Sequence, residues 1–143
     1  MVNVQVLKDH MQKFPMNAQH ATVLFQALFT MYPDLAKYWD AEDIDVDSLP
    51  KSRKYQSMSG QAIRGLFSLV QDVDSDINWK SAVKNMIAEY KEQGVPFSEF
   101  KKIQPAFLKM MEDYAGGLSA EQKNEWNALF DKLHASMEEY GYK

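Results

Sequence analysis

A stretch of helical periodicity between residues 52 and 73 constrains the fold of this chain more than any other feature. Its apolar residues recur at steps of three and four, which predicts a helix with one wide buried face. They are Tyr55, Met58, Ala62, Ile63, Leu66, Phe67, Leu69, Val70 and Val73. Gly60 and Gly65 interrupt the stretch, and each costs about 1 kcal/mol relative to alanine in a helix interior. We therefore expect a neighbouring segment to cross this helix closely, with the small Ala21 facing Gly60.

The composition predicts one folded domain that spans residues 1–143. Hydrophobic residues make up 45% of the chain and aromatic residues 13%, which is enough for a buried core. The net charge of −4 is spread along the sequence, so nothing indicates binding to nucleic acid or to a membrane surface. The absence of cysteine excludes disulfides and thiolate chemistry. There is no apolar run of membrane-spanning length and no signal-peptide pattern, so we expect a cytoplasmic protein.

Helix signals recur along the whole chain, and no pair of alternating segments predicts a hairpin. The predicted helices cover residues 2–14, 21–32, 34–39, 52–73, 77–93, about 98–115 and 119–140, and Asn17 is the expected cap of the second. The acidic residues 40–49 lack periodicity and are predicted to form a loop. Pro105 indicates either a kink or a late start of its helix. Seven or so helices with short connections predict an all-α fold.

The residue types that usually carry chemistry form no catalytic or metal-binding pattern. His10, His20 and His134 are far apart and lack ligand spacing, so we expect them at the surface or at the edge of the core. No serine or threonine is paired with a histidine and a carboxylate, which gives an enzymatic function no support. The acidic run at residues 40–47 lacks the central glycine and the terminal glutamate of a calcium loop.

Four segments, in the right order, resemble the globin family over essentially the whole chain. Residues 28–34 followed by Tyr38 and Trp39 are similar to the end of the second globin helix and the short third one. Gly60 with Ile63 resembles the centre of the distal helix. Residues 94–100 resemble the corner that leaves the proximal helix, and residues 119–130 the start of the last helix. The resemblance implies a globin-like fold of seven to eight helices with a haem pocket for oxygen binding.

The resemblance also places the haem-binding positions of the family on unusual residues. The proximal histidine, which holds the haem iron, corresponds to Tyr90, or to Glu89 with a one-residue slip. No histidine lies between residues 20 and 134, so no realignment supplies one. Ser59 stands at the distal position, and Trp39 replaces the phenylalanine that wedges the haem. Phe25 is expected to fill the distal side of the pocket.

Two further residues complete the expected lining of this pocket, namely Ile63 on the distal helix and Met86. Met86 lies one turn before Tyr90 on the same face and is a second candidate ligand. If haem is bound, Tyr90 is the expected metal ligand. A tyrosinate ligand favours ferric iron, and a phenol with a pKa near 10 needs a nearby cation to ionise at neutral pH. The two arginines, Arg53 and Arg64, both lie on the predicted distal helix.

Two function classes follow from these residues. The favoured one is a globin that has lost ordinary haem binding and acts through a protein surface or an apolar pocket that takes a small apolar ligand. The alternative is a haem protein with an unusual axial ligand, Tyr90 or Met86, that serves gas binding, redox chemistry or peroxidase-like chemistry. A helical interaction domain unrelated to globins is the third hypothesis. Nothing in the sequence indicates an oligomeric state.

Overall fold

The computed structural model describes residues 2–143, and all regular secondary structure within them is helical. Seven α-helices and three 3₁₀-helices follow one another in this part of the chain. They are α1 (Val4–Met11), η1 (Ala18–His20), α2 (Val23–Met31), η2 (Pro33–Trp39), η3 (Val46–Lys51), α3 (Arg53–Asp72), α4 (Asp76–Glu92), α5 (Phe97–Phe100), α6 (Ile103–Tyr114) and α7 (Ala120–Glu139). The predicted all-α class is confirmed. No helix in residues 2–143 is both long enough and apolar enough to cross a membrane.

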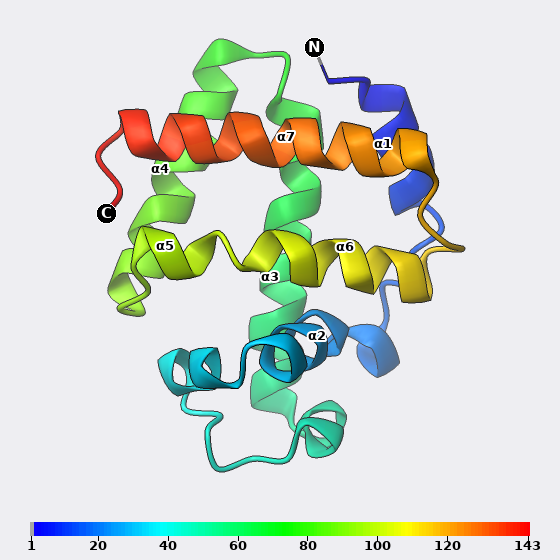
Figure 1. Cartoon of the computed structure of the whole chain (residues 1–143), viewed down its shortest axis with the longest axis vertical. Coiled ribbons are helices and arrows are strands. Elements are labelled where there is room, and N and C mark those ends of the chain that lie inside the picture. The colour runs from blue at the N-terminus through cyan, green and yellow to red at the C-terminus, as the bar shows by residue number, and fades with distance from the viewer. Residues whose placement is uncertain (1) are drawn as a thin grey trace.

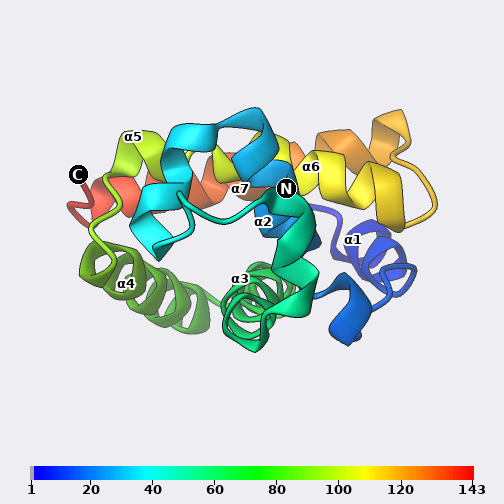
Figure 2. The same ribbon diagram turned by 90° about the horizontal axis from the view of Figure 1, so that it is seen from below.

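The longer helices lie in two crossed layers. In Figure 1, α5, α6 and α7 run across the front, and α3 and α4 pass behind them at a steep angle. Figure 2 shows the same two layers from below, with α1 at the side of α3. One buried aromatic cluster joins the layers: Phe67 of α3 lies 5.9 Å from Phe107 of α6 and 6.2 Å from Trp126 of α7, measured between ring centroids. The core therefore fills the space between the layers.

Most helix ends lie where local sequence signals predict them. Ser52, Ser75 and Ser119 each cap a helix by accepting a hydrogen bond from a backbone N–H three residues later. Ser119 also forms the predicted capping box with Gln122. At the end of α4, Gly94 has a φ of 80°, which a glycine adopts without strain. These ends are predictable because the capping residue and its partner are close neighbours in sequence.

Three of the predicted boundaries were wrong. Asn17 caps η1, where its side chain accepts from the N–H of His20, and α2 begins only at Val23. Residues 40–49 were predicted as a loop, but residues 46–51 form η3, whose Leu49 is fully buried. The first helix ends at Met11, earlier than predicted. The η3 turn accompanies the tertiary burial of Leu49, a signal that periodicity does not contain.

Pro105 marks a late start of α6. α5 ends at Phe100 and α6 begins at Ile103, so Pro105 lies in the first turn. The N–H groups in the first turn of a helix have no intrahelical acceptor. A proline in that turn, which lacks an N–H, therefore costs no hydrogen bond. Of the two predicted outcomes, the late start is the one observed.

The expected close contact at Gly60 is present. A Cβ atom at Gly60 would lie 3.7 Å from the Cβ of Ala21 and 3.3 Å from Nη1 of Arg64. Ala21 precedes α2, so this contact holds α3 against the chain that enters α2. Gly65 differs, because its nearest neighbour would be Cε of Met86 at 3.9 Å, which is ordinary van der Waals contact. Ala21 faces Gly60 as expected, but at ordinary van der Waals distance, and the tighter neighbour of Gly60 is Arg64 of the same helix.

His10 is fully buried, contrary to the expectation of a surface or edge position. Its Nδ1 accepts a hydrogen bond of 2.9 Å from Nε1 of Trp126, and its Nε2 donates one of 2.8 Å to the carbonyl of Gly117. These two bonds define a neutral imidazole with the proton on Nε2, and they join α1 to α7 and to the connection before α7. Burial is the main cause that lowers the pKa of His10.

We predict that the contact at Gly60 does not tolerate a larger residue. Gly60→Leu should lower the free energy of unfolding by about 1–3 kcal/mol because the side chain overpacks against Ala21 and Arg64. Gly65→Ala is the matched control and should leave the protein equally stable or up to about 1 kcal/mol more stable, because alanine has the higher helix propensity. Urea denaturation measures both. Equal midpoints for Gly60→Leu and the native protein would contradict the contact.

We also predict that His10 destabilises the fold in acid. Because its folded-state pKa lies below the unfolded value near 6.5, the unfolded chain binds more protons, and stability falls as the pH drops below about 6.5. His10→Gln keeps a donor and an acceptor but does not titrate, so its stability should fall less between about pH 7 and pH 5. His20→Gln makes the same substitution at a half-buried position of η1, away from the contact between α1 and α7, and is the control variant. An unchanged pH slope in His10→Gln would refute the prediction.

Candidate functional site

A small cavity lies where α2, η2, α3 and α4 meet. It has a volume of about 60 Å³ and is lined by Phe25, Trp39, Met58, Gln61, Ala62, Glu89, Tyr90 and Gln93. Pockets that take small organic ligands usually measure about 300–1,000 Å³. One water molecule occupies about 30 Å³ in the liquid. The cavity as formed therefore has room for very few water-sized molecules.

Aromatic rings from α2 and η2 fill the space beside this cavity. The ring centroid of Phe25 lies 5.1 Å from those of Phe29 and Trp39, and Phe29 and Trp39 are 5.8 Å apart. None of the three side chains is more than 4% exposed. Tilted aromatic pairs at such distances contribute about 0.5–1.5 kcal/mol beyond the burial of their area. The chain's own side chains thus stabilise the closed form of the cavity.

Trp39 is held in place by a hydrogen bond from α3. The hydroxyl of Tyr55 donates to the carbonyl oxygen of Asp40 at 2.7 Å and lies 3.2 Å from that of Trp39. Asp40 ends η2 with a φ of 55°, a left-handed conformation that aspartate tolerates better than most residues. The turn that carries Trp39 is therefore anchored to the helix on the other side of the cavity.

Tyr90 enters the cavity from α4 and is 6% exposed. Its ring meets that of Phe100 edge to face, with 4.7 Å between centroids. Burial raises the pKa of the Tyr90 hydroxyl far above its usual range, and the charge of Glu89 and the nearby Tyr142 raise it further. No lysine or arginine lines the cavity. Tyr90 is consequently a neutral phenol at physiological pH.

The end of α4 that carries Tyr90 is tied to the C-terminal segment. The N–H of Val95 donates to the carbonyl of Tyr90 at 2.9 Å, which closes α4 around Gly94. The carbonyl of Val95 in turn accepts a hydrogen bond of 2.6 Å from the hydroxyl of Tyr142. Burial raises the pKa of this Tyr142 hydroxyl to about 12, so it keeps its proton and its donor role. These bonds limit the movement of Tyr90 relative to the core.

The structure brings three of the six residues proposed from the sequence to the cavity, namely Phe25, Trp39 and Tyr90. Ser59 and Ile63 are fully buried but are not among the lining residues. Oγ of Ser59 accepts a hydrogen bond of 3.4 Å from the N–H of Phe25, so it faces α2.

Met86 also lies elsewhere. It lines a neighbouring hollow of about 220 Å³ between α3 and α4, together with Gly65, Leu69 and Glu89, the last of which also lines the aromatic cavity. The distance of 3.9 Å between its Cε and the Cβ position of Gly65 places its tip against α3. The structure therefore separates Met86 from Tyr90, although both lie on one face of α4.

Three α3 residues that line the cavity were missed from the sequence: Met58, Gln61 and Ala62. Their spacing of three and four is that of one helical face. Met58 and Ala62 already belonged to the apolar pattern of this helix, and that pattern was the available signal. Ser59 was proposed instead because it directly precedes Gly60. One residue along a helix turns the side chain by about 100°, so Ser59 points away from the cavity that Met58 lines.

The chemical groups around the cavity form a limited donor set. They comprise a phenol from Tyr90, a thioether from Met58, the amides of Gln61 and Gln93, and the carboxylate of Glu89. Neither an imidazole nor a thiolate is among them. Within residues 2–143, no three histidine, cysteine, aspartate or glutamate side chains are grouped so that they could hold a metal ion.

Comparison with known proteins identifies the family of this fold. The family model described as Globin matches residues 22–137. A globin of Tritia mutabilis is 26% identical over 133 residues, which cover 89% of this chain and 90% of that one.

Solved structures show the same fold. Ferric myoglobin of Aplysia limacina superposes with a TM-score of 0.82 at 17% identity, covering 96% of this chain and 95% of that chain. A globin-like protein of C. elegans also gives 0.82, at 18% identity, covering 100% of this chain and 98% of the other. Since the family model spans more than half of the sequence, this chain belongs to the globin family.

Proposed function

We propose that this protein is a haem-free globin that acts by binding a small apolar molecule or a protein surface, not by carrying oxygen. The observation that carries the proposal is the neutral, buried Tyr90 beside a cavity of only about 60 Å³, next to the packed rings of Phe25 and Trp39. By the family resemblance, Tyr90 occupies the place of the proximal histidine.

The donor chemistry around Tyr90 does not fit haem. Reversible oxygen binding needs a neutral imidazole on ferrous iron. A phenol coordinates iron well only as phenolate, and the environment of Tyr90 raises the pKa of that group. The histidines on either side in sequence offer no substitute: His20 pairs with Asn17 in η1, and His134 packs among Phe97 and Phe100.

The space beside Tyr90 does not fit haem either. A large planar group there requires Phe25 and Trp39 to leave positions in which they are at most 4% exposed. Moving one such side chain into water costs about 1.5–3 kcal/mol. The hydrogen bond between Tyr55 and Asp40 that holds the turn of Trp39 opposes the same movement.

A small apolar ligand suits the lining better. Phe25, Trp39, Met58 and Ala62 present carbon and sulfur to one part of the cavity, and Gln61, Glu89 and Gln93 line the rest. Met58 is only half-buried, and a methionine side chain is flexible enough to adapt to a small molecule. Binding of a small apolar ligand by these side chains requires no haem iron.

The alternative is a haem-binding globin with an unusual axial ligand, which would bind a gas or carry out redox or peroxidase-like chemistry. Tyr90 lines the cavity whereas Met86 lies in the neighbouring hollow, and this observation favours Tyr90 as the ligand in that case. Tyrosine ligation would favour ferric iron and peroxide chemistry.

Haemin binding distinguishes these functions. After mixing with haemin and gel filtration, the native protein should retain no stoichiometric haem absorption. The double variant Tyr90→His with Trp39→Phe adds a nitrogen donor and removes ring volume, so it should gain stoichiometric haem. Tyr90→Phe with Trp39→Phe is the matched control, because it frees similar space without the nitrogen and should stay colourless.

A native protein that retains stoichiometric haem, with a spectrum that changes in Tyr90→Phe, would overturn the haem-free proposal. It would establish the tyrosine-ligated alternative instead. Retention of haem that is unaffected by Tyr90→Phe would exclude both assignments of this site.

A further inference from the structure

The two arginines of this chain line one groove on the outer side of α3. The groove has a volume of about 410 Å³ and is lined by Met16, Asn17, Ala18, Ala21, Arg53, Gln56, Ser57 and Arg64. It shares no residue with the aromatic cavity, and no acidic residue lines it. Its volume lies within the range of about 300–1,000 Å³ that is usual for small-molecule sites. This basic groove is therefore a second candidate site, separate from the first.

The arginines belong to a single stripe of α3. Arg53, Ser57, Gly60 and Arg64 follow one another at steps of four, three and four, so they share one face of the helix. Nη1 of Arg64 lies 3.3 Å from the position of a Cβ on Gly60, and Nη2 lies 3.8 Å from it. The guanidinium of Arg64 therefore folds back over Gly60 toward Arg53. A side chain at residue 60 would occupy that space.

The two cationic ends are separated by a definite distance along the helix. Gly60, where the Arg64 guanidinium rests, lies seven residues after Arg53, which is about two helical turns or about 10 Å. Between them the stripe offers the hydroxyl of Ser57, and the facing wall offers the apolar Met16 and Ala21. Asn17 and Gln56 complete the lining, so the groove has two charged ends joined by uncharged residues, of which Met16, Ala18 and Ala21 are apolar.

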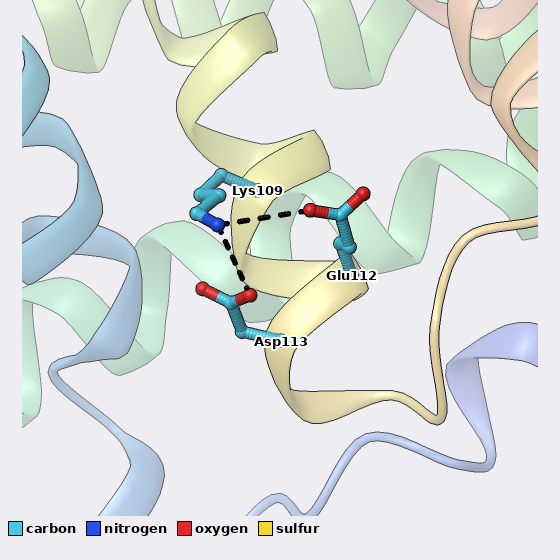
Figure 3. Close-up of polar contacts among 3 residues, drawn as sticks. All are labelled: Lys109, Glu112 and Asp113. Atoms are coloured by element: carbon cyan, nitrogen blue, oxygen red, sulfur yellow. Dashed lines mark hydrogen bonds and ion pairs between the residues drawn. The ribbon is translucent and has the colours of Figure 1, made fainter.

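Neither arginine takes part in any ion pair found among residues 2–143. Lys109 shows the contrast: Figure 3 shows its Nζ between two carboxylates of its own helix, at 3.6 Å from Glu112 and 3.2 Å from Asp113. The chain carries 20 acidic residues and a net charge of −4, so carboxylates that could pair with an arginine are common in the sequence. The guanidinium donors of Arg53 and Arg64 instead face the groove and its solvent.

We propose that this groove binds a small organic dianion whose two acidic groups are separated by an apolar spacer. Each guanidinium takes one acidic group, because its planar fork matches the two oxygens of a carboxylate. The N-terminus of α3, which begins at Arg53, adds positive potential at that end of the groove. Met16 and Ala21 pack against the spacer. The site goes beyond the haem-free function proposed above and does not depend on it.

The probe is suberate, a dicarboxylate whose extended length is about that of two helical turns. Because the chain has only two arginines, the arginine Nε–H region of a ¹⁵N-correlated NMR spectrum holds two signals, which Arg53→Gln and Arg64→Gln assign. Suberate at constant ionic strength should shift both signals with one shared, saturable dissociation constant. Octanoate, which has a single carboxylate on the same carbon chain, and inorganic phosphate, a compact dianion, should each bind at least tenfold more weakly.

The variants test each end of the groove. Arg53→Gln and Arg64→Gln should each weaken suberate binding at least tenfold, which corresponds to about 1.4 kcal/mol. Lys54→Gln removes the same charge from the neighbouring residue, which packs over Tyr55 and lies outside the groove, and should change the affinity less than twofold.

Three results would overturn the proposal. The first is arginine signals whose shifts do not saturate with suberate. The second is an affinity for octanoate or phosphate equal to that for suberate. The third is a loss of suberate affinity in Lys54→Gln as large as that in the arginine variants. Circular dichroism of each variant separates lost binding from lost folding, and the haemin experiment has no bearing on the result because it probes the other cavity.

Discussion

The packing of α3 against the chain that enters α2 is shared by both candidate sites, because each site is lined by residues of α3. With no side chain at residue 60, α3 approaches the chain entering α2 until Cβ of Ala21 is 3.7 Å from the Cβ position of Gly60. This orientation turns Met58, Gln61 and Ala62 toward the aromatic cavity and places Arg53 and Arg64 along the outer groove. One helix thus contributes side chains of different chemistry to two sites.

The two sites have opposite electrostatic character. Tyr90 is itself buried and no cation lines its cavity, so the phenol stays neutral, and the aromatic rings of Phe25 and Trp39 pack beside it. In the groove of Arg53 and Arg64, solvent supports the charges, and the guanidinium donors are available to an anion. The globin fold therefore carries a neutral buried phenol at one candidate site and two solvent-exposed guanidinium groups at the other.

Local signals predicted the parts of the fold whose causes are local. The serine caps, the capping box at Ser119 and the end of α4 at Gly94 each depend on residues a few positions apart. Prediction failed where a distant partner decides the structure. Leu49 is buried in a short helix that has no periodicity, and His10 leaves the surface because Trp126, far away in sequence, donates a hydrogen bond to it.

The sequence alone determined which chemical groups are available: no cysteine, no histidine between residues 20 and 134, two arginines on one helix, and a phenol before the Gly94 corner. It also determined the helical stripes. Only the tertiary structure decided which side of α3 faces the cavity, because a shift of one residue rotates a helix by about 100° and the apolar stripe is wider than that step. It likewise decided the cavity volume of about 60 Å³, because the packing of rings from separate helices has no signature in the order of residues.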